Sequence, residues 1–117
     1  MRILVIEEHA RNREMLKELL SLYFPNFTIA TVGDSQRGLE LLHQFKPQFV
    51  VINYETREKR VIDYIKKNNL PIKIIALTLG NHKKPLTTLA DCAICVKYPF
   101  FGLALKNGIQ KLAGAFT

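Results

Sequence analysis

The chain has 117 residues, of which 48% are hydrophobic and 23% are charged. This composition is typical of one soluble globular domain with one core, and it excludes a disordered chain. The longest apolar runs are too short to span a bilayer, and the apolar N-terminus is too short for a signal peptide, so we expect a cytoplasmic protein with no membrane partner. The formal net charge is +7. Residues 1–53 hold six basic and six acidic side chains, whereas residues 54–117 hold eleven basic and four acidic ones.

Short apolar runs alternate with amphipathic stretches along the chain. In chain order the predicted elements are strand Arg2–Ile6, helix Arg11–Tyr23, strand Phe27–Thr31, a helix capped by Asp34 or Ser35, strand Phe49–Asn53, a helix marked by Val61, Ile62 and Ile65, strand Ile72–Leu77, strand Ala93–Val96 and helix Phe100–Ala113. The segment Gly80–Ala90 stays ambiguous, because Gly80 and Pro85 both weaken a helix. Five strands separated by helices predict an α/β fold with a parallel sheet, right-handed crossovers and helices on both faces.

Polar side chains stand at the ends of four predicted strands. They are Glu7 and Glu8 after the first strand, Asn53 at the end of the third, Thr78 after the fourth and Lys97 after the fifth. In an open parallel sheet, ligands bind at the carboxyl ends of the strands. The sequence therefore predicts that these side chains share one edge of the sheet.

Five segments match a known family pattern in the right order. They are residues 1–9 (MRILVIEEH), 33–42 (GDSQRGLELL), 47–53 (PQFVVIN), 74–78 (IIALT), and 90–91 (AD) together with 97–100 (KYPF). Together they resemble the receiver domain of two-component response regulators over nearly the whole chain. The resemblance implies a single domain over residues 1–117, with a flavodoxin-like, doubly wound, five-stranded parallel sheet in strand order 2-1-3-4-5. The stretch between Thr78 and Lys97 is shorter than in the family, so we expect the fourth helix to be shortened or irregular.

The phosphorylation site of that family is altered in this chain. The family has an aspartate at the position of Asn53, which accepts a phosphoryl group and holds Mg²⁺ together with two acidic residues. An amide is a poor nucleophile, so Asn53 is a degenerate phospho-acceptor position. Glu7 and Glu8 are each one methylene longer than the usual aspartates, which weakens an octahedral magnesium site. We interpret them as a vestigial acidic pocket and expect no metal and no cofactor.

Other positions of the family's switch also depart. Thr78, Ile94 and Lys97 occupy the switch positions, but many family members have an aromatic residue where Ile94 stands. Tyr98 separates Lys97 from Pro99, whereas in the family the lysine directly precedes the proline. We expect Thr78 to form a local hydrogen bond. With Asn53 neutral, we expect Lys97 to pair with Glu7 or Glu8.

Cys92 and Cys95 form a C-x-x-C pattern, which raises the question of redox or zinc chemistry. Structural zinc needs four ligands, and residues three apart on a strand point to opposite faces. We therefore interpret both as small buried side chains. No Ser-His-Asp, P-loop or dinucleotide-binding pattern is present, so no catalytic residue is assigned.

The sequence thus predicts an atypical receiver domain that acts in signal transduction as a phosphorylation-independent protein-interaction module and is not an enzyme. The candidate partner-binding residues are Lys83, Lys84, Tyr98, Phe101 and Lys106, and their charge favours a protein partner with an acidic patch. We expect the chain to be a monomer or a weak homodimer.

Two alternatives remain. The basic second half is one feature of a nucleic-acid-binding protein, although it lacks a helix-turn-helix or an aromatic stacking pattern, so this alternative is favoured less. An unrecognised enzyme with a site at Glu7, Glu8, Asn53 and Lys97 is the other, and no pairing of a nucleophile with a base supports it.

Overall fold

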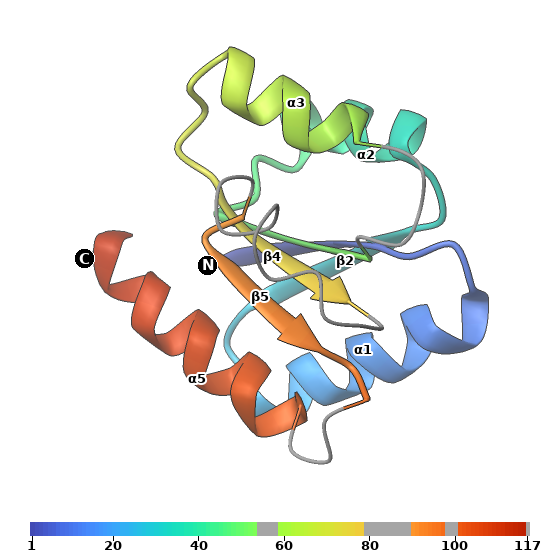
Figure 1. Ribbon diagram of the computed structural model, residues 1–117, viewed down its shortest axis with the longest axis vertical. Coiled ribbons are helices and arrows are strands. Elements are labelled where there is room, and N and C mark those ends of the chain that lie inside the picture. The colour runs from blue at the N-terminus through green and yellow to red at the C-terminus, as the bar shows by residue number, and fades with distance from the viewer. Residues whose placement is uncertain (54–58, 79–89, 98–100, 117) are drawn as a thin grey trace.

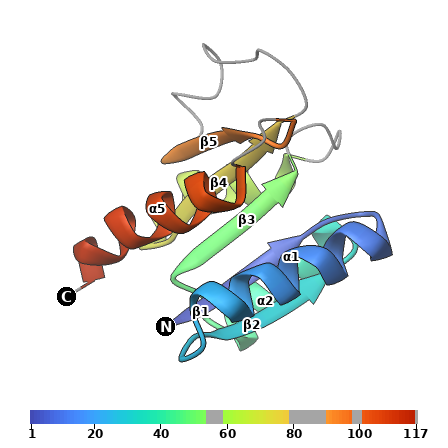
Figure 2. The same cartoon turned by 90° about the horizontal axis from the view of Figure 1, so that it is seen from below.

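The five strands form one parallel sheet. The computed structural model describes residues 1–53, 59–78, 90–97 and 101–116. The strands are β1 (Arg2–Ile6), β2 (Thr28–Val32), β3 (Phe49–Asn53), β4 (Lys73–Thr78) and β5 (Cys92–Cys95). They pair in the order β2-β1-β3-β4-β5, and every pairing is parallel (Figures 1 and 2). The predicted α/β class and strand order are confirmed.

Helices cover both faces of the sheet, as predicted. Helices α1 (Ala10–Tyr23) and α5 (Phe101–Ala113) lie on one face, and α2 (Ser35–Gln44) and α3 (Arg60–Lys67) lie on the other (Figure 1). A short 3-10 helix, Gly114–Phe116, follows α5. None of the described helices is long and apolar enough to cross a bilayer. The predicted shortening of the fourth helix concerns residues 79–89, which lie outside the described part of the chain.

The alternation of side chains along β1 builds two cores. Ile3 and Val5 pack toward α1 and α5, whereas Leu4 and Ile6 pack toward α2 and α3. All four are buried, because a parallel sheet between two helical layers exposes neither face. The middle of the sheet, β1, β3 and β4, is therefore rigid, and it positions whatever side chains follow at the strand ends.

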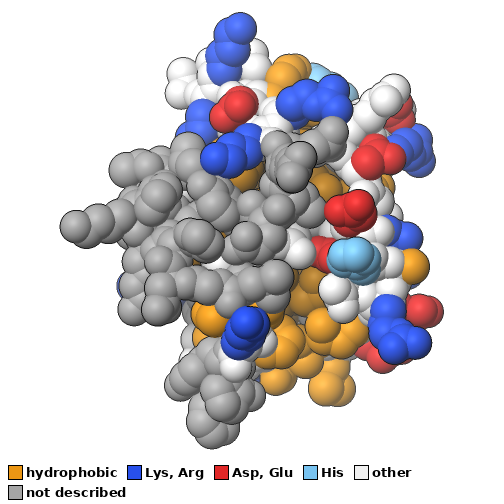
Figure 3. Space-filling view, turned by 45° about the vertical axis from the view of Figure 1, so that its right-hand side comes forward, with side chains coloured by type: hydrophobic (Ala, Val, Ile, Leu, Met, Phe, Trp, Pro, Cys, Tyr) orange, Lys and Arg blue, Asp and Glu red, His pale blue; other side chains and the backbone are white. Residues whose placement is uncertain are grey.

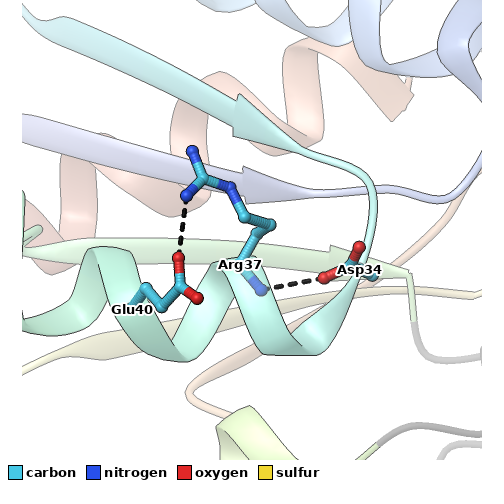
Figure 4. Close-up of polar contacts among 3 residues, drawn as sticks. All are labelled: Asp34, Arg37 and Glu40. Atoms are coloured by element: carbon cyan, nitrogen blue, oxygen red, sulfur yellow. Dashed lines mark hydrogen bonds and ion pairs between the residues drawn. The ribbon is translucent and has the colours of Figure 1, made fainter.

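Helix α2 begins with a side-chain cap. The Asp34 carboxylate accepts a hydrogen bond from the backbone N–H of Arg37 at 2.8 Å, and the Arg37 side chain pairs with Glu40 at 2.7 Å (Figure 4). Of the two predicted caps, Asp34 is thus the one used. Further along the helix, a Cβ at Gly38 would lie 2.8 Å from Cδ1 of Ile6, so glycine permits the close approach of α2 to β1.

Three strands, β2, β4 and β5, are shifted by one residue from their predicted ranges. Those ranges were Phe27–Thr31, Ile72–Leu77 and Ala93–Val96. At β2 the reason is Phe27, which is apolar but lies outside the strand. Its ring stacks on Phe24 at 4.8 Å and on Phe49 at 6.4 Å between centroids. Phe27 is therefore apolar because it packs in the core just before β2, and it is not part of the strand.

Candidate functional site

A pocket of about 490 Å³ opens at the carboxyl end of the sheet. Its lining residues are Glu7, Glu8, His9, Asn12, Met15, Leu16, Asn53, Leu77, Val96 and Phe101. The pocket brings together Glu7, Glu8 and Asn53, as the sequence predicted. Its polar wall comes from the β1–α1 turn and the end of β3, and its apolar wall comes from α1, the ends of β4 and β5, and the start of α5.

Glu7 is nearly fully buried, with 2% of its surface exposed. Its carboxylate oxygen Oε1 accepts from the backbone N–H of His9 at 3.2 Å and from the side-chain amide of Asn12 at 3.4 Å. Both donors belong to the start of α1, where His9 provides no side-chain cap of its own. A helix N-terminus has unsatisfied N–H groups and favours negative charge. Glu7 therefore anchors the first turn of α1.

Arg13 holds the same turn from its other side. One guanidinium nitrogen, Nη1, donates to the carbonyl oxygens of Glu7 and Glu8, both at 2.8 Å. The backbone N–H of Glu7 also donates to the carbonyl of Val32 at 3.0 Å. The roles of Asn12 and Arg13 were not predicted from the sequence, because a polar residue in the first turns of a helix is ordinarily solvated. Their contacts with the turn fix the acidic wall of the pocket.

The pocket does not fit the magnesium ion that the fold family implies. Asn53, half-buried at the end of β3, offers an amide in place of a carboxylate. One oxygen of the Glu7 carboxylate, Oε1, already accepts hydrogen bonds from His9 and Asn12. Mg²⁺ requires near-ideal octahedral oxygen geometry, and the amide of Asn53 together with the longer side chains of Glu7 and Glu8 weakens such a site. Within the described ranges, no group of three or more His, Cys, Asp or Glu side chains could hold a metal ion.

The switch-position residues lie at the ends of β4 and β5. Thr78 is buried, and its carbonyl accepts from the backbone N–H of Val96 at 2.8 Å. Ile94 is buried in the core beneath α5 and is opposite Leu77 in the strand register. Ile94 thus fills space in the core.

The predicted pairing of Lys97 with the acidic pair is wrong. Lys97 is exposed, and no ion pair joins it to Glu7 or Glu8 in the described structure. The preceding residue, Val96, is the one that lines the pocket. The apolar Val96 therefore lies on the wall of the pocket where a cation was expected.

Two of the five candidate partner-binding residues are placed by the structure. Phe101 begins α5, is half-buried and lines the pocket. The Lys106 ammonium lies 5.5 Å from the centre of the Tyr23 ring, so it joins α5 to α1 through a cation–π contact. The other three, Lys83, Lys84 and Tyr98, lie outside the described residues.

The two cysteines are free thiols on β5 and are half-buried. Burial raises the pKa of the Cys92 thiol, the Asp91 carboxylate raises this pKa further, and Lys111 acts in the opposite direction. A thiol with a raised pKa carries little thiolate at neutral pH, which makes it a poor nucleophile. The arrangement gives no support to a redox role for Cys92.

Comparisons with known proteins identify the fold. No protein-family model and no curated protein sequence matches the chain. Among solved structures, the chain is similar to the signal receiver domain of a DNA-binding response regulator (merR) from Colwellia psychrerythraea 34H. Their TM-score is 0.83 at 22% identity, over 97% of this chain and 98% of that one. A LuxR-family DNA-binding response regulator from Staphylococcus aureus gives a TM-score of 0.81 at 20% identity, over 95% of this chain and 97% of that one.

A third similar structure is the response regulator protein TrrA from Thermotoga maritima, solved in complex with Mg²⁺ and BeF. Its TM-score is 0.77 at 27% identity, over 95% of this chain and 97% of that one. The similarity therefore covers nearly the full length of both chains in all three cases. This chain has the fold of response-regulator receiver domains.

Proposed function

We propose that this chain acts in signal transduction as a receiver-fold module that binds other proteins without being phosphorylated. The observation that carries the proposal is the amide of Asn53 in the pocket at the carboxyl end of the sheet. A phosphoryl group transferred to a receiver forms an acyl phosphate, which requires a carboxylate nucleophile. The amide oxygen is a poor nucleophile and the amide nitrogen is delocalised, so no such intermediate forms on Asn53.

The surroundings of Asn53 support the same conclusion. A phosphoryl group carries negative charge, and it needs a cation in the pocket to offset that charge. The pocket is lined by Glu7 and Glu8, while Lys97 is exposed and pairs with neither glutamate. The charge balance of the described pocket therefore opposes an incoming anion.

Without a covalent switch, a signal must come from binding itself. A partner shifts a conformational equilibrium only by as much as its affinity differs between the two states. The partner surface proposed from the sequence is the basic one around Lys83 and Lys84 together with α5, where Phe101 and Lys106 are placed. A partner with an acidic patch suits this charge.

The loss of phosphorylation is tested with beryllofluoride, which mimics a phosphoryl group on a carboxylate. Amide NMR spectra of the ¹⁵N-labelled chain are recorded before and after adding Mg²⁺ and beryllofluoride. We expect no stoichiometric change at Asn53, Thr78 or Ile94. A receiver domain that has the aspartate is the positive control. A saturable, equimolar response in this chain would show that the pocket still accepts the group and would reject the proposal.

The interaction role is tested by capturing partners from the native host. The bait is the wild-type chain, and the comparison baits are Lys83→Glu with Lys84→Glu, and Lys106→Glu alone. We expect a partner that the charge-reversed baits lose and that binds equally well with and without a phosphoryl donor. A partner whose binding requires the donor would contradict phosphorylation independence.

Nucleic-acid binding is the second candidate, because α3 ends in two exposed basic residues, Lys66 and Lys67, in a chain of net charge +7. Binding through phosphates releases counterions, so the affinity would fall linearly in log–log form as salt rises. Titration of the chain with mixed DNA and RNA at low salt measures whether it binds nucleic acid. An absence of binding at low salt discards this candidate.

A further inference from the structure

A second hollow, with a volume of about 450 Å³, lies at the other end of the sheet, where β3 and β4 begin. Its described walls come from the end of α2, the loops that lead into β3 and β4, and the 3-10 helix at residues 114–116. They consist of Leu42, His43, Lys46, Pro47, Gln48, Leu70, Pro71, Ile72 and Phe116, and we call this hollow the amino-end pocket. Strand β3, five residues and roughly 17 Å long, separates it from the pocket that contains Asn53.

The walls of the amino-end pocket are mostly apolar. Leu42, Leu70 and Ile72 belong to the core beneath α2 and α3 or pack against it. On the other side, the Phe116 ring packs edge-on against the Phe49 ring at 5.5 Å, where the end of α5 reaches the starts of the strands (Figure 2). The pocket therefore lies where the two cores meet. Small-molecule sites have such apolar walls, a volume of about 300–1,000 Å³ and a few polar groups.

The loops around the amino-end pocket are tied to the sheet. The backbone N–H of Gln48 donates to the Arg2 carbonyl at 3.0 Å, and Gln48 Oε1 accepts from the Arg2 backbone N–H at 2.7 Å. The Gln48 carbonyl accepts from the backbone N–H of Lys73 at 2.9 Å. Pro47 and Pro71 each have a fixed φ. A pocket with walls held in this way loses little conformational entropy when a ligand binds.

Lys46 gives the amino-end pocket a positively charged rim. It follows Phe45, the C-cap of α2, and its φ of 51° lies in the left-handed region that favours glycine. Its carbonyl accepts from Arg2 Nε at 3.1 Å, which holds the backbone in place. The side chain is exposed, and no ion pair engages its ammonium in the described structure. Strained backbone at a residue other than glycine is a feature of functional sites, and here it places a cation at the rim.

The charges around this rim are mainly positive. The last turn of α3 carries Lys66 and Lys67, and basic side chains gather over α3 at the top of the space-filling view (Figure 3). No acid is among the described lining residues. On the neighbouring elements, Glu40 pairs with an arginine of α2 at 2.7 Å, and Asp91 accepts from a backbone N–H of β4 at 2.7 Å. Asp63 lies one turn before the two lysines of α3, which offset its charge.

We propose that the amino-end pocket binds a small amphipathic carboxylic acid. The carboxylate lies beside the Lys46 ammonium, and the apolar body packs between Leu70 and Phe116. An apolar cation would be repelled by the rim, and a neutral apolar molecule would leave its charge without a partner. A single lysine matches the single charge of a carboxylate, whereas a phosphate monoester carries up to two. The site is remote from Asn53, so the inference can fail while the proposed function holds.

Three molecules with the same apolar chain and different head groups test the inference: octanoate, octanol and octylammonium. Amide NMR spectra of the ¹⁵N-labelled full chain are recorded during titration with each. Octanoate should bind with a dissociation constant on the order of 1 mM and shift the amides of Lys46, Gln48, Leu70 and Phe116, but not that of Asn53. Octanol should bind about three- to fivefold more weakly, and octylammonium more weakly still.

Substitution of Lys46 tests which group meets the carboxylate. Lys46→Gln should raise the dissociation constant of octanoate by about three- to fivefold and leave that of octanol unchanged, because only the carboxylate meets the removed charge. Lys17→Gln removes the same charge at an exposed position on α1, and as the matched control it should leave both constants unchanged.

Lys46→Gly separates a loss of binding from a loss of folding. Glycine adopts the left-handed backbone without strain, so this variant should unfold at a higher urea concentration than the wild type. It should nevertheless lose the preference for octanoate over octanol, since the ammonium is gone.

Several results would overturn the inference. One is an absence of saturable shifts with octanoate at about 20 mM. Another is an equal affinity for octanoate and octanol in the wild type, which would leave the hollow as an apolar surface without selectivity. A third is a set of shifts centred on Glu8 and Asn53, which would assign octanoate to the pocket at the carboxyl end of the sheet.

Discussion

The guanidinium of Arg13 lies 2.8 Å from the carbonyl oxygen of Glu7, and this contact joins α1 to the end of β1. The same nitrogen reaches the carbonyl of Glu8 at 2.8 Å. A Cβ at Gly33, just after β2, would lie 2.8 Å from it as well, so the guanidinium also borders the end of β2. The printed contacts of this guanidinium are therefore with backbone oxygens, and no ion pair joins it to the carboxylate of Glu7 or Glu8 among the described residues.

Arg13→Ala should lower the free energy of unfolding by about 1–2 kcal/mol, because it removes a charged donor from the carbonyl oxygens of Glu7 and Glu8, and the contact with Glu7 is partly buried. Urea denaturation measures the change. Arg11→Ala is the matched control: Arg11 is exposed on the same helix, and its loss should change stability by less than about 0.5 kcal/mol. Equal effects of the two substitutions would show that the Arg13 contacts contribute nothing to stability.

Gly38→Ala should destabilise the chain by about 1 kcal/mol despite the better helix propensity of alanine. The added Cβ would lie 2.8 Å from Ile6 Cδ1 and 3.2 Å from Val61 Cγ2, and Val61 is fully buried. Overpacking therefore outweighs propensity at this site. Thermal and urea unfolding of the variant measure the balance.

A second substitution tests whether contact with Ile6 causes the loss of stability in Gly38→Ala. Ile6→Val removes the Cδ1 atom that the new Cβ would meet, at a cost of about 1 kcal/mol by itself. In combination with Gly38→Ala, the loss should be smaller than the sum of the two single losses. Strict additivity would indicate that the clash with Ile6 is absent.

The sequence sufficed for the sheet because its signals were local. Each strand was a short apolar run bounded by polar residues, and the helices between them required parallel pairing. Phe27 and Val96 were assigned to strands because apolar character marks burial and not hydrogen bonding. Phe27 packs on Phe24 and Phe49, and Val96 lines the pocket, both outside a strand.

The candidate site was predicted only in part, because strand ends give positions but not directions. The meeting of Glu7, Glu8 and Asn53 followed from the parallel sheet. The orientation of Lys97 depends on the turn after β5, and its sequence carries no signal for that. The Tyr64 hydroxyl also contacts His43 Nε2 at 2.9 Å and joins α3 to α2 across 21 residues. This contact was likewise not predicted from the sequence.

The stability of the chain should fall more steeply above neutral pH than it does in Cys92→Ala. Burial and the Asp91 carboxylate raise the pKa of the Cys92 thiol in the folded state. The folded protein therefore holds this proton more tightly than the unfolded one does. The protonated Cys92 thiol therefore makes its full contribution to the free energy of unfolding below the pKa of an unfolded thiol, about 8.5. This contribution declines as pH rises through the higher pKa of the folded state.

Urea denaturation between about pH 7 and pH 10 measures this slope. Cys92→Ala should flatten it, and Cys95→Ala, which keeps Cys92, should retain it. Parallel slopes for Cys92→Ala and the wild type would mean that Cys92 titrates alike in both states.

Asn53→Asp should destabilise the chain at neutral pH, by about 1–2 kcal/mol, because it adds a carboxylate to a pocket already lined by Glu7 and Glu8. Like charges raise the folded-state pKa of the new carboxyl above its unfolded value, so the deficit is largest well above that pKa and disappears as pH falls below about 4. Adding Mg²⁺ should recover part of the loss at pH 7, since the variant regains a carboxylate ligand. Asn26→Asp, the same change at an exposed turn, should leave stability nearly unchanged.

If Asn53→Asp is as stable as the wild type at pH 7 without metal, the pocket is hydrated enough to screen three carboxylates. Charge repulsion would then not oppose a phosphoryl group in this pocket, and only the amide chemistry of Asn53 would prevent phosphorylation.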